Sequence, residues 1–224
     1  MKKILLPLLC CLLATSCLKD DTFSMQGYSD FATVYQGKLV TDSAATLTVV
    51  KDESGSDIWK NEGARLFIRC DILNRNFDIT LKTVLEASRP HPTPYVEKED
   101  EPDDPVEILG QGIGGRYVNL LLSVYGSPAS DALHPVTFHY TANTAGDEVT
   151  LYVLHDGNHE NPAYMEEKKL QQTMLAFSIP LEDILKKGVR TQLSLCLYQL
   201  VKAQDGTYSV QKKTYSLKDT ITLL

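Results

Sequence analysis

A two-residue alternation of apolar and polar side chains recurs along this chain and limits what it can fold into. In Arg65–Ile72, every second residue from Leu66 onward is apolar. Because successive side chains of a strand point to opposite faces, this period indicates a strand with one buried face. Three similar stretches lie nearby: Phe31–Tyr35, Leu47–Lys51 and Phe77–Leu85. Residues 30–88 therefore predict a small β-barrel, of which the OB-fold is the common partly open form.

Residues 107–224 carry a second set of stretches with strand character, separated by turn signals. The last two are joined by Asp205-Gly206, which predicts a hairpin. A short helix is expected at Pro180–Lys187, with proline in its first turn and Gly188 after its end. Strands without βαβ alternation predict an immunoglobulin-like β-sandwich. The six stretches are Tyr117–Tyr125, Val136–Thr141, Val149–His155, Leu175–Ile179, Leu193–Val201 and Tyr208–Leu217.

Residues 89–106 interrupt this pattern with alternating prolines, followed by an acidic run around Pro102. Alternating prolines favour an extended backbone, and like charges repel one another and stay solvated. We expect a linker or exposed loop between the two domains. A docking tail for a basic partner is the alternative hypothesis.

The first sixteen residues have the order of a secretory signal peptide. Lys2 and Lys3 precede an apolar run that is too short to span a bilayer, and small residues lead into Cys17. A cysteine at this place resembles the lipobox of bacterial lipoproteins, in which the thiol is acylated and becomes the mature N-terminus. We therefore expect a cleaved signal peptide at residues 1–16 and a lipidated polar leader at residues 17–29.

Charge and cysteine content narrow the expected partners. The chain has a net charge of −7, and cleavage before Cys17 would remove two further positive charges. Nucleic acids and anionic lipid headgroups need a basic surface, so we expect no nucleic-acid partner and membrane contact only through acyl chains such as palmitate on Cys17. Cys70 and Cys196 are expected to be buried free thiols.

The densest polar cluster is His155–Glu160. His155, Asp156, His159 and Glu160 could ligate zinc or support hydrolysis. However, Gly157-Asn158 is a turn signal, and histidines four residues apart share a face only in a helix. We therefore expect His155 to point inward at a strand end as a structural residue. The sequence predicts no catalytic residue, no metal site and no cofactor.

Glycines and aromatic residues offer weaker candidates. Gly110 to Gly115 carry four glycines but are followed by a strand, so they predict a bulge or tight turn, not a phosphate loop. Trp59 follows a loop tip and is either a plug of the barrel or an exposed ligand platform. Four tyrosines are expected to be cross-strand packing residues, with sugar stacking as the alternative; they are Tyr117, Tyr125, Tyr140 and Tyr152.

Several segments resemble the NigD-like lipoproteins. They are Arg116–Leu120, His134–Tyr140, Leu154–Pro162 and Phe177–Ile184. This resemblance implies an N-terminal OB domain and a C-terminal β-sandwich, but no established activity. Lys19, Asp20 and Asp21 resemble the acidic export signal that sends lipoproteins to the outer face of the outer membrane in one Gram-negative phylum.

Our leading hypothesis is a non-catalytic lipoprotein, lipid-anchored in the outer membrane and facing outward, that binds a glycan, a peptide or an outer-membrane protein. One alternative is a hydrolase or metalloprotein that uses the cluster His155–Glu160. The other is a structural or immunity subunit that docks on an outer-membrane complex through a sheet edge or through residues 89–106.

Overall fold

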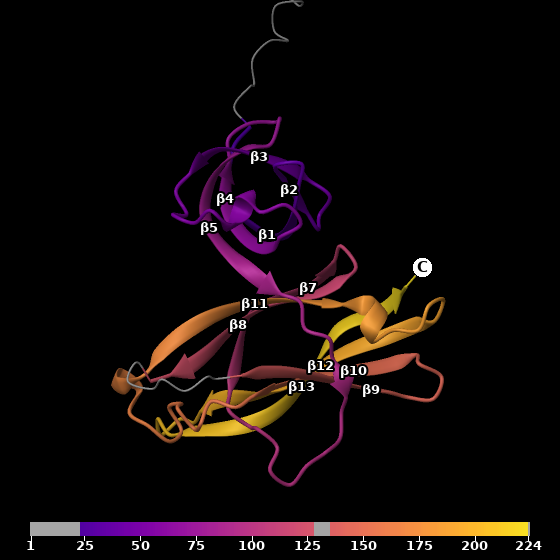
Figure 1. The fold of residues 1–224 in the computed structure, drawn as a ribbon. Coiled ribbons are helices and arrows are strands. Elements are labelled where there is room, and N and C mark those ends of the chain that lie inside the picture. The colour runs from indigo at the N-terminus through magenta and orange to yellow at the C-terminus, as the bar shows by residue number, and fades with distance from the viewer. Residues whose placement is uncertain (1–22, 128–134, 224) are drawn as a thin grey trace, which may run out of the picture.

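The structure is a computed structural model that describes residues 23–127 and 135–223. A barrel and a two-layered β-sandwich follow one another along the chain (Figure 1). The all-β fold class is thus as predicted. Cys17, Lys19, Asp20 and Asp21 lie outside the described residues. Within them, no helix is long and apolar enough to cross a membrane.

Five strands form the barrel, and they close because β3 pairs with both β2 and β5. The strand order around the ring is therefore β1, β2, β3, β5, β4 and back to β1, which gives the five-stranded OB-type barrel. The alternating apolar residues of β4, Leu66 to Ile72, fill its centre. The strands are β1 (Met25–Tyr35), β2 (Lys38–Thr41), β3 (Thr46–Asp52), β4 (Arg65–Ile72) and β5 (Asp78–Ser88).

Trp59 packs against the edge of the barrel core rather than standing free. It belongs to the 3₁₀ turn η1 (Ile58–Lys60), is half-buried and lies against the core residues. Its indole Nε1 donates a 2.8 Å hydrogen bond to Asp52. Of the two interpretations that the sequence left open, the structure supports the plug.

The sandwich has two sheets with an apolar core between them. Strands β11, β8 and β7 form one layer, and β13, β12, β10, β9 and β6 form the other in that order. Among the described residues, seventeen buried ones form the core, including Leu120, Leu151 and Leu195. The strands are β6 (Thr93–Pro94), β7 (Val106–Gly114), β8 (Tyr117–Gly126), β9 (Val136–Ala142), β10 (Glu148–His155), β11 (Gln171–Pro180), β12 (Arg190–Lys202) and β13 (Tyr208–Thr222).

Turns and glycines behave largely as the sequence indicates. The hairpin at Asp205-Gly206 joins β12 to β13. The glycine-rich stretch is strand β7, which has a register shift between Ile108 and Gly110 and ends in a turn at Gly115.

The helix expected at Pro180–Lys187 is wrong. Only the 3₁₀ turn η3 (Leu181–Asp183) forms, and Leu181, Ile184 and Leu185 all reach the sandwich core. The chain leaves this turn at Lys187 and Gly188, which pair with Leu223, before a further helical turn can form. The remaining 3₁₀ turn is η2 (Glu167–Lys169).

Barrel and sandwich share one sheet. The end of β5 pairs in parallel with β11, which makes an eight-stranded sheet that runs through both units. A small apolar cluster lies on this junction, formed by Phe31 and Ala87 from the barrel and Leu121 and Ala176 from the sandwich. Figure 1 shows β5 leaving the barrel and reaching the sandwich sheet.

A buried polar cluster sits beside this junction. The Arg65 side chain is 2% exposed, and its guanidinium pairs with the Asp42 carboxylate within the barrel. It also donates to Ser178 Oγ and Asn119 Oδ1 of the sandwich, both at 3.0 Å. Asn119 Nδ2 in turn donates to Asp42 at 2.5 Å. One arginine therefore ties the two units together.

Cys70 and Cys196 are both buried and free, as predicted. Cys70 lies in the barrel core and Cys196 on β12 of the sandwich. Burial, together with the charge of Asp71, raises the pKa of Cys70 to about 11. Its thiol is therefore unreactive at neutral pH in the folded protein.

Candidate functional site

The segment expected to be a linker or exposed loop is attached to the sandwich at several points. Residues 93–104, which we call the strap, begin with β6, and β6 pairs in parallel with β9 at Thr93 and His139. Tyr95 continues this pairing, because its N–H donates to the Tyr140 carbonyl at 2.8 Å. Residues 96–100 are exposed, as expected for a loop, but the segment is not a free linker, because aromatic and hydrogen-bonding contacts hold it to the sheet at several points.

Tyr95 and Glu101 fix the middle of the strap. The Tyr95 ring stacks on Tyr152 of β10, with ring centroids 3.9 Å apart and an interplanar angle of 3°. Glu101 accepts hydrogen bonds from Tyr198 at 3.0 Å and Lys212 at 2.8 Å, and also from Tyr95. Lys212 in turn lies over the rings of Tyr95, Tyr152 and Tyr198.

Asp104 fixes the end of the strap. Its side chain is 5% exposed and accepts hydrogen bonds from the N–H groups of Gly157 and His159, at 2.9 and 3.1 Å. The Asn161 side-chain amide donates to its other oxygen at 2.6 Å. Asp104 therefore organises the loop that follows β10.

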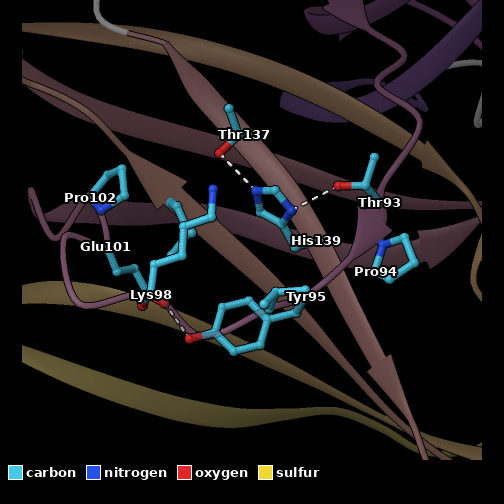
Figure 2. A pocket seen from close by; sticks show the side chains of 10 residues that line it. Thr93, Pro94, Tyr95, Lys98, Glu101, Pro102, Thr137 and His139 are labelled. Carbon is cyan, nitrogen blue, oxygen red and sulfur yellow. Dashed lines mark hydrogen bonds between the residues drawn. The ribbon is translucent and has the colours of Figure 1, made fainter.

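A pocket of about 410 Å³ opens between the strap and β9. That volume lies within the usual range of small-molecule sites, about 300–1,000 Å³. Figure 2 shows Tyr95, Glu101 and His139 among the side chains that line it. The full lining is Thr93, Pro94, Tyr95, Val96, Lys98, Glu101, Pro102, Thr137, His139 and Leu154.

The polar groups of the pocket are held in place by one another. His139 Nδ1 lies 2.9 Å from the Thr93 hydroxyl and Nε2 lies 3.2 Å from the Thr137 hydroxyl, as Figure 2 shows. Burial and the nearby charge of Lys98 lower the pKa of His139. The ring is therefore neutral at pH 7. The O–H bonds of Thr93 and Thr137 can rotate, so each hydroxyl can donate its hydrogen bond either to the ring or to a ligand.

The carboxylate at the strap is equally fixed. Burial alone raises the pKa of Glu101, but hydrogen bonds from Lys212, Tyr95 and Tyr198 outweigh it and hold the pKa below its usual range. Glu101 is thus ionised and fully engaged near neutral pH. A pocket of aromatic, proline and neutral hydrogen-bonding groups is suited to binding a polar ligand.

We expect the strap to make the stability of the protein depend on pH in acid. Because the pKa of Glu101 is lower in the folded state, its contribution is complete above the unfolded value of about 4.3 and is lost as pH falls through the folded value. Glu101→Gln should therefore be less stable than wild type at pH 7, and the gap should narrow below about pH 4.3. Urea unfolding across this range measures the gap.

The control for that experiment is Glu97→Gln, since Glu97 is an exposed residue of the same strap. Its unfolding should follow wild type at each pH. If the difference in free energy of unfolding between wild type and Glu101→Gln stayed constant down to pH 2, the carboxylate of Glu101 would not hold the strap.

The cluster His155–Glu160 does not converge on one point. His155 is 2% exposed at the end of β10, which confirms its predicted inward direction, whereas the His159 side chain is 61% exposed. Glu160 accepts a hydrogen bond from the Ser127 N–H. Across residues 23–127 and 135–223, no group of three or more His, Cys, Asp or Glu side chains could hold a metal ion. The zinc hypothesis therefore has no geometric support.

Sequence reasoning found some residues of this region and missed others. Tyr152 and Tyr140 are half-buried in the sheet, as expected for cross-strand packing, and so are Tyr117 and Tyr125. Tyr95 and Glu101 were missed because they lie among prolines and acidic residues. Tyr95 was the one available signal, since a lone aromatic residue in a charged segment often has a packing partner.

No family model matches the chain, and no curated protein matches it in sequence. Solved structures do match. A NigD-like immunity protein from Bacteroides caccae has a TM-score of 0.57 at 17% identity, over 90% of this chain and 100% of that one. A candidate toxin-related protein from Parabacteroides distasonis has a TM-score of 0.53 at 16% identity, over 86% of this chain and 94% of that one.

A candidate lipoprotein from Bacteroides fragilis also matches, with a TM-score of 0.51 at 10% identity over 86% of this chain and 99% of that one. These matches confirm the fold that the resemblance implied, a barrel followed by a β-sandwich. At such low identity they establish the fold alone.

Proposed function

We propose that this chain, which has the fold of the NigD-like proteins, is a non-catalytic, cell-surface accessory lipoprotein that binds a ligand in the strap pocket. The observation that best supports this proposal is the pocket itself. Its aromatic wall, Tyr95, stacks on Tyr152 of β10, and its hydrogen-bonding groups, His139 with Thr93 and Thr137, come from β9 and β6. A rigid, preorganised pocket of this kind is suited to recognition.

A neutral polyhydroxylated ligand, such as a glycan, fits this chemistry best. The Tyr95 ring and the two prolines of the lining offer apolar surface to a sugar ring, and histidine and threonine groups can exchange hydrogen bonds with its hydroxyls. Of the two charged residues of the lining, Glu101 is already paired with Lys212, and the Lys98 ammonium can donate hydrogen bonds to sugar hydroxyls.

We expect His139→Leu to weaken glycan binding by about tenfold or more, the equivalent of one lost hydrogen bond of roughly 1.4 kcal/mol. Leucine keeps the bulk of the ring but removes both nitrogens. The measurement is a glycan array probed with the full-length lipidated protein, followed by titration of any glycan that binds. His91→Leu is the control, since His91 is exposed, lies outside the pocket and pairs with Asp183.

Two results would contradict this proposal. One is an array on which the intact protein binds nothing. The other is a glycan whose affinity is unchanged in His139→Leu, since binding would then take place elsewhere on the molecule.

The lipid anchor and the outward orientation belong to the same proposal. Support comes from the order of residues up to Cys17 and from the fold shared with a candidate lipoprotein. Mass spectrometry of protein from its native membrane is expected to find an acylated Cys17 at the N-terminus, and protease treatment of intact cells is expected to remove the protein. An unmodified thiol or a retained leader would contradict the anchor.

A further inference from the structure

A second cavity of about 390 Å³ lies between the barrel and strand β7, on the other side of the sandwich sheet from its core. On the barrel side it is lined by Asp30, Phe31 and Phe67, and on the sandwich side by residues 110–114 of β7. None of these residues lines the strap pocket. We call this cavity the β7 groove.

Glycines leave the groove-facing side of β7 bare. In the register of β7 and β8, Gly110 lies opposite Leu121 and Gly112 opposite Asn119. Leu121 packs against Phe31, so this face of the sheet is turned toward the barrel. A Cβ atom at Gly112 would meet no atom within 4 Å. Alternate glycines in a strand often mark a place where another backbone or a ligand approaches closely.

The edge of β7 away from β8 pairs with no strand, although the start of β7 lies beside Gln199 and Leu200 of β12. β7 is the outermost strand of the eight-stranded sheet and pairs only with β8. Among the backbone hydrogen bonds of the described residues outside the strand ladders, none involves residues 107–114. Leu109, at the bulge, is 46% exposed. Such an edge presents a row of N–H and C=O groups to which an extended chain can add.

The groove holds a carboxylate without a cation. Asp30 Oδ2 accepts hydrogen bonds from the Ser43 hydroxyl at 2.7 Å, the Tyr28 hydroxyl at 2.9 Å and the Ser43 N–H at 3.2 Å, and Oδ1 accepts one from the Phe31 N–H at 2.7 Å. No lysine or arginine of the described residues forms an ion pair with it. Asp42, the other acid of the lining, is paired with Arg65. The net charge offered to a ligand is therefore negative, beside the aromatic wall of Phe31 and Phe67.

We infer that the β7 groove binds an extended peptide segment of a partner protein. The peptide backbone pairs with the open edge of β7, and a lysine or arginine side chain enters the groove. There the aromatic wall packs against the methylene stem, and Asp30 pairs with the cationic head. The strap pocket and this groove are separate sites, so the inference goes beyond the proposed function and does not depend on it.

The experiment selects binders to the full-length protein from a phage-displayed library of random short peptides. We expect the selected peptides to share a lysine or arginine among strand-forming residues, and their binding to weaken as salt is added. Gly112→Val places side-chain atoms in the groove at a position where a Cβ atom meets nothing within 4 Å, and it should weaken binding of a synthetic copy of the selected peptide by about tenfold or more. Asp30→Asn should do the same by removing the charge.

Controls separate the groove from general effects. Asp57→Asn removes the same charge from an exposed loop of the barrel and should leave peptide affinity unchanged, as should His139→Leu in the strap pocket. The inference is overturned if no peptide is selected, if the selected peptides lack a basic residue, or if they bind Gly112→Val as well as wild type. A glycan whose binding is lost in Gly112→Val would also overturn it, because the groove would then be a saccharide site.

Discussion

Replacing Arg65 with methionine is expected to lower the free energy of unfolding by about 3–5 kcal/mol, as the loss of one partner of a buried ion pair does elsewhere. Methionine keeps much of the length of the arginine but leaves the Asp42 carboxylate, whose side chain is only 8% exposed, without its cation. The hydroxyl of Ser178 and the amide of Asn119 also lose a donor. The measurement is urea unfolding at neutral pH.

A double variant identifies the cause. Arg65→Met combined with Asp42→Asn removes the stranded charge and should recover part of the lost stability, because a neutral group is far less costly to bury. Arg69→Met is the matched control on the same strand, since Arg69 is exposed and lies away from the junction. A loss below about 1 kcal/mol in Arg65→Met would mean that the cluster does not couple barrel and sandwich.

The same arginine shows where prediction from sequence ends. The alternation in Arg65–Ile72 correctly places Leu66, Ile68 and Cys70 inside the barrel. It also assigns Arg65 and Phe67 to the outer, solvent-facing side. In the structure, sandwich residues more than 50 positions further along the chain cover this side, and Asn119 and Ser178 are the ones that accept hydrogen bonds from Arg65. Periodicity reports which residues share a face, but not what packs on that face.

Short or glycine-rich strands escaped prediction for a related reason. β2 and β6 have four and two residues, too few to show a period, and β7 lacks side chains on one face. Their pairing comes from neighbours in space. β4 and β8 were located to within a residue at each end, because each offers one continuous apolar face to a core. β1 and β11 begin several residues before the predicted stretches, because their first residues are largely exposed.

The candidate site was harder to predict than the fold. Within residues 89–106, charge and proline content favour a solvated chain. However, Glu101 meets Tyr198 and Lys212 at separations of 97 and 111 residues. Such partners cannot be identified from local composition. An acidic run therefore indicates a solvated segment only where no residue distant in sequence donates hydrogen bonds to its carboxylates.

Asp104→Ala is expected to lower the free energy of unfolding by about 3 kcal/mol, since each buried donor left unsatisfied costs roughly 1–3 kcal/mol. The substitution removes the acceptor of the Gly157 and His159 N–H groups and of the Asn161 amide. Two of these three hydrogen bonds are buried, so water cannot replace the carboxylate without opening the loop. Amide hydrogen exchange at Gly157 should accelerate with the loss of stability.

Asp103→Ala is the matched control, because Asp103 is the preceding residue, is more exposed and carries the same charge. Its stability should stay within about 0.5 kcal/mol of wild type. If Asp104→Ala behaved like this control, the end of the strap would be held by its prolines and backbone alone. Asp104 is not part of the pocket lining. If Asp104→Ala loosened the loop after β10 and also weakened ligand binding in the strap pocket, Asp104 would therefore act on the pocket indirectly, by positioning the strap.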